Sequence, residues 1–266
     1  MIAAAAWKYG AFVRIAAARA RRDRGEVYGR VVFFAVILGV FSSLWRAIAE
    51  AGMPIAADPK RLVWYLATTE WIVLSAPPIH IELQESIRRG DVVCRLGRPV
   101  SYVGSAFAEA VGLLVVRAPL LAATAWICAV AFTGWIPPLA LLAWTLPFGF
   151  AAAALITGMH LWIGLLAFWL EDVSPVFWVA QKLLFVLGGL MLPINLYPDA
   201  MRTAAAFTPF PVMLAGPASL VLPHNGGGFG GLGTLAVRLL AWGTVMAVAV
   251  WWEFRRARAT LTINGG

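Results

Sequence analysis

The chain has 266 residues, of which 61% are hydrophobic, and its formal net charge is +8. Soluble domains are about 45–50% apolar, so this composition excludes an ordinary soluble domain and indicates membrane lipid as the surroundings. A basic charge is also typical of nucleic-acid binding, but membrane proteins collect Lys and Arg on their cytoplasmic loops, so we expect no nucleic-acid partner. The two cysteines, Cys94 and Cys128, argue against a disulfide framework.

Residues 1–27 predict an amphipathic helix on the cytoplasmic surface of the membrane. Basic residues are scattered through this Ala-rich run instead of preceding a clean apolar core, which argues against a signal peptide. On a helical wheel the cations gather on one half of the surface, as in helices that lie along a bilayer. These cations are Lys8, Arg14, Arg19, Arg21 and Arg22. A plain basic flank of the first span is the alternative.

Six apolar stretches follow that are long enough to cross a bilayer, since a spanning helix needs about 20 apolar residues. They cover roughly residues 30–50, 62–80, 103–133, 138–169, 176–193 and 232–252. The third and fourth exceed the minimum length, and Pro147 would allow a kink in the fourth. The sequence therefore predicts an all-α membrane protein whose six-span transmembrane domain covers residues 28–254.

The loop between the second and third spans, residues 81–101, concentrates charge of both signs. Glu82, Glu85 and Asp91 alternate with arginines at 88, 89, 95 and 98. Anionic lipid headgroups alone would not require the acids, so this pattern favours pairing with a protein surface. A solvated loop that only sets the membrane orientation is the alternative.

Several ionisable residues fall inside the predicted spans, where each costs a few kcal/mol or more at the bilayer centre and needs a partner or water. Glu70 lies near the middle of the second span, and Lys182 lies in the fifth. We expect Glu70, Glu109, Arg117 and Arg238 to form an intramembrane polar path for substrate. A carboxylate facing a transport cleft would suit a cationic substrate. The alternative is a structural ion pair of Glu70 with Arg117 or Arg238.

Residues 194–231, before the last span, are too apolar for an aqueous loop. Five prolines divide them into short pieces: Pro198, Pro209, Pro211, Pro217 and Pro223. Non-helical backbone at membrane depth persists only where it is buried in protein or lines a wet cavity. The segment therefore predicts two short re-entrant helices, at about 198–207 and 211–220, with a surface-lying amphipathic loop as the alternative.

The loop cations predict the orientation of the chain. Fourteen Lys and Arg residues lie in the termini and the 81–101 loop, against four on the opposite side. The side with more Lys and Arg is cytoplasmic, so both termini, including a tail at residues 255–266, are expected in the cytoplasm. An even number of spans requires the same arrangement. We expect a multi-pass protein of the bacterial plasma (inner) membrane.

The stretch SIRRGDVVCRLGRPVSY, residues 86–102, resembles the Ile-Arg-x-Gly-Asp … Leu-x-Arg-Pro signature of type-2 ATP-binding-cassette (ABC) permeases. The nearest branch is the six-span permeases that include viologen-exporter components. Residues 164–193 and 196–220 support the resemblance, which covers nearly the whole chain in order. Gly97 departs from the pattern, because a bulkier apolar residue is expected before Arg98 and Pro99.

The resemblance implies an ATP-driven exporter. Permeases of this family pair with a second, same or homologous, permease subunit and sit on two copies of a separate ATPase, which binds ATP and Mg. Their loop between spans 2 and 3 is a coupling helix that docks on the ATPase. Carried over to this chain, the docking residues are Glu85, Arg88, Arg89, Gly90 and Asp91, and the residues that anchor the return of the loop are Arg95, Arg98 and Pro99.

The chain itself carries no phosphate-binding loop of the form G-x-x-x-x-G-K-[ST] and no catalytic motif. We therefore expect no enzymatic activity, metal or cofactor in this chain. Two other functions stay open. One is an ion-coupled secondary transporter that uses Glu70, Glu109 and Arg117, although such carriers commonly contain internal repeats and none is found. The other is a membrane scaffold without transport.

Overall fold

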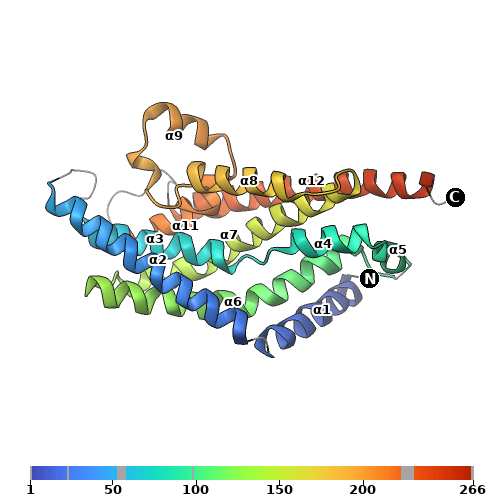
Figure 1. The fold of residues 1–266 in the computed structure, drawn as a ribbon, viewed down its shortest axis with the longest axis horizontal. Helices are drawn as coiled ribbons and strands as arrows, with labels where there is room; N and C mark the ends of the chain where they lie inside the picture. Colours follow the sequence, from blue (N-terminus) through green and yellow to red (C-terminus); the bar gives the residue numbers. More distant parts are fainter. Residues whose placement is uncertain (1, 23, 53–57, 98, 223–230, 265–266) are drawn as a thin grey trace.

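The computed structural model describes residues 2–22, 24–52, 58–97, 99–222 and 231–264. These residues form helices and connecting turns, and no strand occurs among them. The long helices lie side by side along one axis (Figure 1). The start of α1, the end of α12 and helix α5 lie at one end of this axis, and α9 lies at the other.

The described helices follow one another along the chain. In chain order they are α1 (Ile2–Arg22), α2 (Arg24–Glu50), α3 (Pro59–Ser75), α4 (Ile79–Arg88), α5 (Asp91–Leu96), α6 (Tyr102–Thr133), α7 (Leu139–Leu165), α8 (Ser174–Leu187), α9 (Asp199–Ala206), α10 (Phe210–Met213), α11 (Ala215–Ser219) and α12 (Leu232–Asn264). Among the described residues, the 3-10 turn η2 (Leu166–Phe168) follows α7, and the 3-10 turn η3 (Ile194–Leu196) follows α8. The all-α prediction is confirmed for the described residues.

Four helices in the described part of the chain are long and apolar enough to cross a membrane. They cover Tyr28–Glu50, Tyr102–Thr133, Leu139–Phe168 and Leu232–Ala259, close to four of the six predicted spans. The other two predicted spans correspond to shorter helices, α3 with 17 residues and α8 with 14. The count of six therefore stays a prediction.

The second predicted span, 62–80, has different bounds in the structure. Helix α3 begins at Pro59, where the Asp58 carboxylate accepts a hydrogen bond from the Arg61 N–H at 3.2 Å. It ends at Ser75, because the consecutive prolines Pro77 and Pro78 supply no backbone N–H and force the preceding residues into extended backbone. A separate helix, α4, starts directly after them.

Helix α3 lies at the centre of the bundle and contacts α2, α6 and α7. Trp64, Leu66 and Trp71 are fully buried. The indole N–H of Trp71 donates to the carbonyl of Ala118 on α6 at 2.7 Å. Its ring lies where any side chain on Gly149 of α7 would stand, so this glycine makes room for the tryptophan. A large aromatic ring thus joins three helices.

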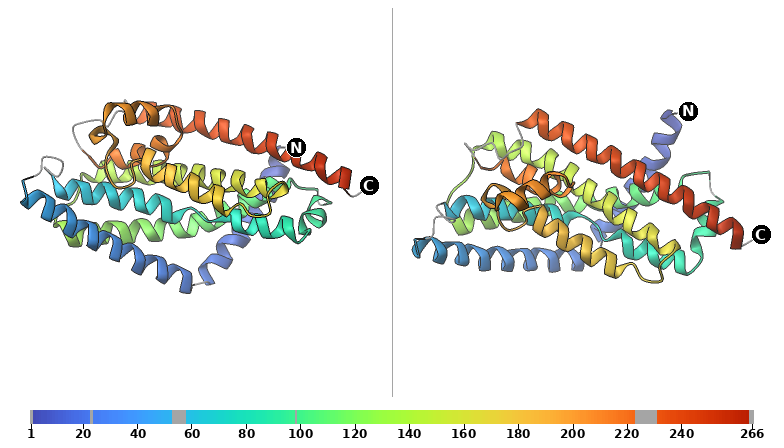
Figure 2. Two further views of the ribbon diagram at one scale, coloured as in Figure 1. Left: turned by 45° about the horizontal axis from the view of Figure 1, so that its top comes forward. Right: turned by 90° about the horizontal axis from the view of Figure 1, so that it is seen from above.

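Helix α1 packs along α6 through small residues. Gly112 of α6 lies directly against Val13 and Ala16 of α1, with no space for a side chain. The five cations named above for this helix are on its exposed surface. Helix α1 ends at Arg22 and meets α2 at a sharp angle (Figure 2). Its position relative to a membrane surface stays a prediction.

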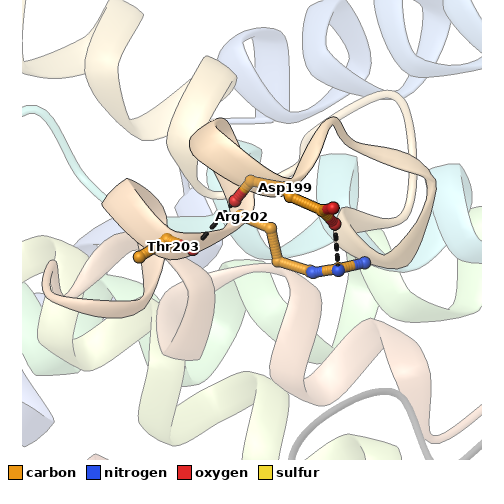
Figure 3. A network of polar contacts seen from close by, with 3 residues as sticks. All are labelled: Asp199, Arg202 and Thr203. Carbon is orange, nitrogen blue, oxygen red and sulfur yellow. Dashed lines mark hydrogen bonds and ion pairs between the residues drawn. The ribbon is translucent and has the colours of Figure 1, made fainter.

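The segment before α12 folds into short helices. Residues 199–206 are helical, and so are 210–213 and 215–219, close to the two predicted pieces. In α9 the Arg202 guanidinium pairs with the Asp199 carboxylate, and the Thr203 hydroxyl donates to the Asp199 carbonyl at 2.9 Å (Figure 3). Helix α11 is buried, and its Ala215 N–H donates to the Gly188 carbonyl at 3.1 Å. Re-entry into a membrane stays a prediction, and Pro223 lies outside the described residues.

Candidate functional site

The predicted coupling loop forms two helices, α4 and α5, joined by a tight turn at Gly90. Gly90 has a φ of +78°, a left-handed conformation that costs other residues roughly 1–2 kcal/mol. The chain then enters α6, whose first turn is capped by the Ser101 hydroxyl oxygen, which accepts a hydrogen bond from the Gly104 N–H at 3.2 Å. The glycine therefore sets the angle between the two short helices.

One face of α4 is packed tightly against α7. Ile79, His80 and Leu83 of α4 are buried. They lie over Gly164 of α7, where an added methyl group would stand 2.9 Å from Leu83 Cβ and 3.0 Å from His80 Cα. Cβ atoms in proteins are rarely found this close to another heavy atom, so α4 and α7 approach each other at a distance that only glycine permits. A displacement of α4 toward α7 would therefore push α7 directly.

Further contacts join α4 and the prolines before it to α7 and α8. The His80 ring stacks on Phe177 of α8 with centroids 3.8 Å apart. His160 of α7 donates from Nδ1 to the Pro77 carbonyl at 3.0 Å. The Gln84 side-chain carbonyl of α4 accepts a hydrogen bond from the Val173 N–H, just before α8, at 2.8 Å. Helix α4 is thus held from two sides.

The connection into α8 is ordered by a carboxylate beside α4. Asp172 accepts hydrogen bonds from the Ser174 hydroxyl at 2.7 Å and from the Ser174 N–H at 3.0 Å. These bonds lower the pKa of the Asp172 carboxyl below its usual value, with smaller contributions from Gln84 and Arg88 of α4. The ionised carboxylate stabilises the first turn of α8 next to the candidate coupling helix.

The opposite face of α4 and most of α5 are exposed. The predicted docking and anchoring residues on this surface are Glu85, Arg88, Arg89, Gly90, Asp91, Arg95 and Pro99; Arg98 lies outside the described residues. Glu85 and Arg89 form an ion pair one helical turn apart. We call this set, without Arg98, the exposed charged face.

Two apolar side chains on this surface were not predicted from the sequence. Ile81 of α4 is 57% exposed and Val93 of α5 is 64% exposed. Ile81 precedes Glu85 by four residues and Arg88 by seven, so all three lie on one side of α4. The sequence could have predicted this contact surface from an apolar residue spaced four and seven positions from charged ones. Such spacing places a hydrophobic side chain on the charged side of the helix, where a protein partner would cover it.

A polar cavity of about 220 Å³ lies between α4, α5 and α6. Its charged lining comes from all three helices: Glu82 of α4, Arg95 of α5, and Glu109 and Arg117 of α6. The lining thus carries two carboxylates and two guanidinium groups. Ser86 and Tyr102 complete the polar part of the wall. The structure therefore brings Glu109 and Arg117 to the base of the predicted coupling loop.

The other two predicted intramembrane residues lie elsewhere. Glu70 is 6% exposed within α3, and Arg238 is exposed on α12. Neither lines the polar cavity. Among the residues that the structure describes, no ion pair of Glu70 is found with Arg117 or Arg238. Lys182 is exposed on α8, with its ammonium 5.9 Å from the Trp178 ring.

The described residues are helical apart from turns and include four apolar helices of spanning length, which identifies a multi-pass membrane protein. Residues 63–265 match the family model described as "ABC-2 family transporter protein". The match covers more than half of the chain, so the chain belongs to this family of membrane transport components. Membership implies an ABC ATPase as a partner. No curated protein matches the chain.

Proposed function

We propose that this chain is the permease subunit of an ATP-driven exporter of the bacterial inner membrane. Helices α2, α3, α6, α7, α8 and α12 cross the membrane, with both termini on the cytoplasmic side. The chain forms the translocation path with a second permease subunit, the same or homologous. A separate ATPase, in two copies that bind ATP and Mg, docks on α4 and α5.

A single observation carries the proposal: α4 has one face open to a partner and the other fastened to the bundle. Ile81 and Val93 are exposed on the same two helices as the exposed charged face, which gives a partner both apolar and ionic contacts. The buried face rests on Gly164 of α7 and stacks on Phe177 of α8. A force applied by an ATPase to the open face would therefore reach α7 and α8 without an intervening flexible link.

The polar cavity extends this connection to α6. Its four charged side chains lie on α4, α5 and α6 and balance one another in sign. Charged and polar groups in such a cavity retain water and accommodate small displacements more readily than a close-packed apolar contact does. We infer that α5 shifts against α6 at this cavity while α4 moves together with α7.

The docking role is tested by exchanging the Glu85–Arg89 pair (Glu85→Arg with Arg89→Glu). The exchange keeps the net charge and the pairing within α4, at a cost of a few tenths of a kcal/mol for the reversed order. It reverses the charges that a partner meets. Losing one desolvated interfacial pair costs about 2–5 kcal/mol, so the ATPase should be retained at least about 30-fold less tightly on the purified permease.

The matched control exchanges the Asp199–Arg202 pair of α9 (Asp199→Arg with Arg202→Asp), at the opposite end of the bundle. It should leave ATPase retention and ATP hydrolysis unchanged, because an exposed pair contributes under about 1 kcal/mol. Normal retention and normal hydrolysis in the Glu85/Arg89 exchange would contradict the docking role.

The orientation has its own test, because Cys94 is exposed on α5. In intact cells an impermeant thiol reagent should not label this native cysteine, whereas it should do so in inverted vesicles. In a Cys94→Ser background, Arg61→Cys near the start of α3 should react from outside. The reverse pattern would overturn the assignment of the α5 end to the cytoplasm.

The resemblance to viologen-exporter permeases points to organic cations as the transported class. A buried carboxylate in a transmembrane helix is expensive and marks either a transport path or a helix contact. Glu70 is such a carboxylate on the central helix α3. We propose that Glu70 contributes to cation binding.

A further inference from the structure

An apolar groove of about 440 Å³ runs between α6, α7 and α12. Its walls are hydrocarbon and aromatic side chains such as Phe107, Leu155 and Val250. It is separate from the polar cavity, with which it shares no lining residue. Along α12 it extends from Leu239 to Phe254, about 22 Å at the rise of an α-helix. The groove is therefore long and narrow.

Three glycines line this groove: Gly104 of α6, Gly158 of α7 and Gly243 of α12. An added methyl group would meet Tyr9 of α1 at Gly104 and Met246 of α12 at Gly158, so the helices approach closely at these two positions. A methyl group added to Gly243 would meet no atom within 4 Å, so this glycine faces unfilled space in the isolated chain. The dimensions suit a single flexible hydrocarbon chain.

Cations gather at one end of the groove. Trp251 and Phe254 line that end, and the guanidinium groups of Arg255 and Arg258 lie 5.4 Å and 5.5 Å from their ring centroids. Lys8 of α1 donates to the Pro99 carbonyl at 3.5 Å, two residues before Ser101, which also lines the groove. This end thus combines aromatic rings with positive charge, as interfacial lipid contacts do.

We propose that the groove binds an anionic phospholipid, with one acyl chain along α12 and the phosphate beside Arg255 and Arg258. Basic pockets between transmembrane helices on the cytoplasmic side bind anionic headgroups. The occupant must be apolar along its length and negative at one end. A second copy of this chain, with a net charge of +8, does not meet that requirement. The inference uses the cytoplasmic placement of this end from the proposed function.

The test compares phosphatidylglycerol with phosphatidylcholine bound to the purified full-length chain, measured by native mass spectrometry after detergent exchange. In the double variant Arg255→Gln, Arg258→Gln, the affinity for phosphatidylglycerol should fall about fivefold for each cation removed. The affinity for phosphatidylcholine should not change. Arg202→Gln on α9 is the control cation and should change neither. Inorganic phosphate at millimolar concentration should not displace the lipid.

A second variant tests the groove itself. Gly243→Phe fills the groove and should abolish the retained lipid, whereas Gly233→Phe on the same helix, outside the groove and equally open, should not. Unchanged preference for phosphatidylglycerol in the arginine variant would overturn the proposal. Displacement of the bound lipid by inorganic phosphate alone would also overturn it. The same holds if Gly243→Phe prevents pairing with the second permease subunit but retains the lipid. ATPase retention, measured in parallel, should stay normal, which separates this result from a failure of ATPase docking.

Discussion

Helices α3 and α12 belong to the same bundle but meet opposite surroundings. Helix α3 is buried over most of its length, including Thr68, Thr69 and Glu70. Helix α12 exposes large apolar side chains such as Val237, Leu240 and Val248. By length and hydropathy, α12 contains a candidate span and the shorter α3 does not. Apolar sequence therefore identifies the helices that face lipid better than it identifies those at the centre of the bundle.

The reason is that protein, unlike lipid, can satisfy polar groups. The Thr68 hydroxyl donates to the Trp64 carbonyl at 3.0 Å, and the Thr69 hydroxyl donates to the Leu190 carbonyl at 2.6 Å. The Tyr65 hydroxyl donates to the Gly189 carbonyl at 2.6 Å. A central helix therefore accepts polar residues that would be costly on α12.

Trp71→Ala should destabilise the protein most. Removing a fully buried tryptophan typically costs about 3–5 kcal/mol, and here the Ala118 carbonyl also loses a donor. Trp252→Ala on α12, where the side chain is half exposed, should have a much smaller effect. Thermal unfolding of both variants in the same detergent measures the difference. Equal shifts in Tm would show that α3 is not the structural centre.

Gly164→Ala should displace α4, because the new methyl group meets His80 and Leu83 at 3.0 Å or less. Overpacking of this kind costs about 1–3 kcal/mol, and transport-stimulated ATP hydrolysis should fall. Gly233→Ala makes the same change on α12, where an added methyl group meets no atom within 4 Å, and should be neutral or slightly stabilising. If hydrolysis and Tm are normal in Gly164→Ala, close contact between α4 and α7 does not transmit the ATPase motion.

Glu70→Gln should lower export of cationic substrates several-fold while the permease–ATPase complex still assembles. The charge is lost, but the size and burial of the side chain are kept. Glu253→Gln on α12 is the matched change, because Glu253 is also buried, and it should leave export normal. Export assays on inverted vesicles, with complex recovery as the control, measure both. Failed assembly in Glu70→Gln would indicate a role in helix packing instead.

Gly90→Ala should have the smallest effect. Nothing lies within 4 Å of an added methyl group, so the cost comes from the left-handed backbone alone, about 1 kcal/mol. Gly90→Asn should cost less, since Asn tolerates that conformation. ATPase retention should weaken in the order glycine, asparagine, alanine. Equal retention in all three would show that the angle between α4 and α5 is unimportant for docking.

Local sequence patterns predicted much of the helical framework. Long apolar runs predicted α2, α6, α7 and α12, because a run of about 20 apolar residues has few alternatives to a spanning helix. The second predicted span ran through Pro77 and Pro78, where the structure interrupts the helix before α4, whereas Gly90 was part of the motif that predicted the docking loop. The charges of the exposed face were also readable, since solvated residues need no specific neighbour.

Contacts between distant segments were decided by the tertiary structure alone. The sequence contains Glu82, Arg95, Glu109 and Arg117, but only the packing of α4 and α5 against α6 places all four around one cavity. It likewise contains Gly104, Gly158 and Gly243, but only the arrangement of three helices makes them the wall of one groove. Periodicity specifies which face of a helix is apolar. Which neighbour covers that face depends on side-chain packing among all the helices, and no single segment encodes it.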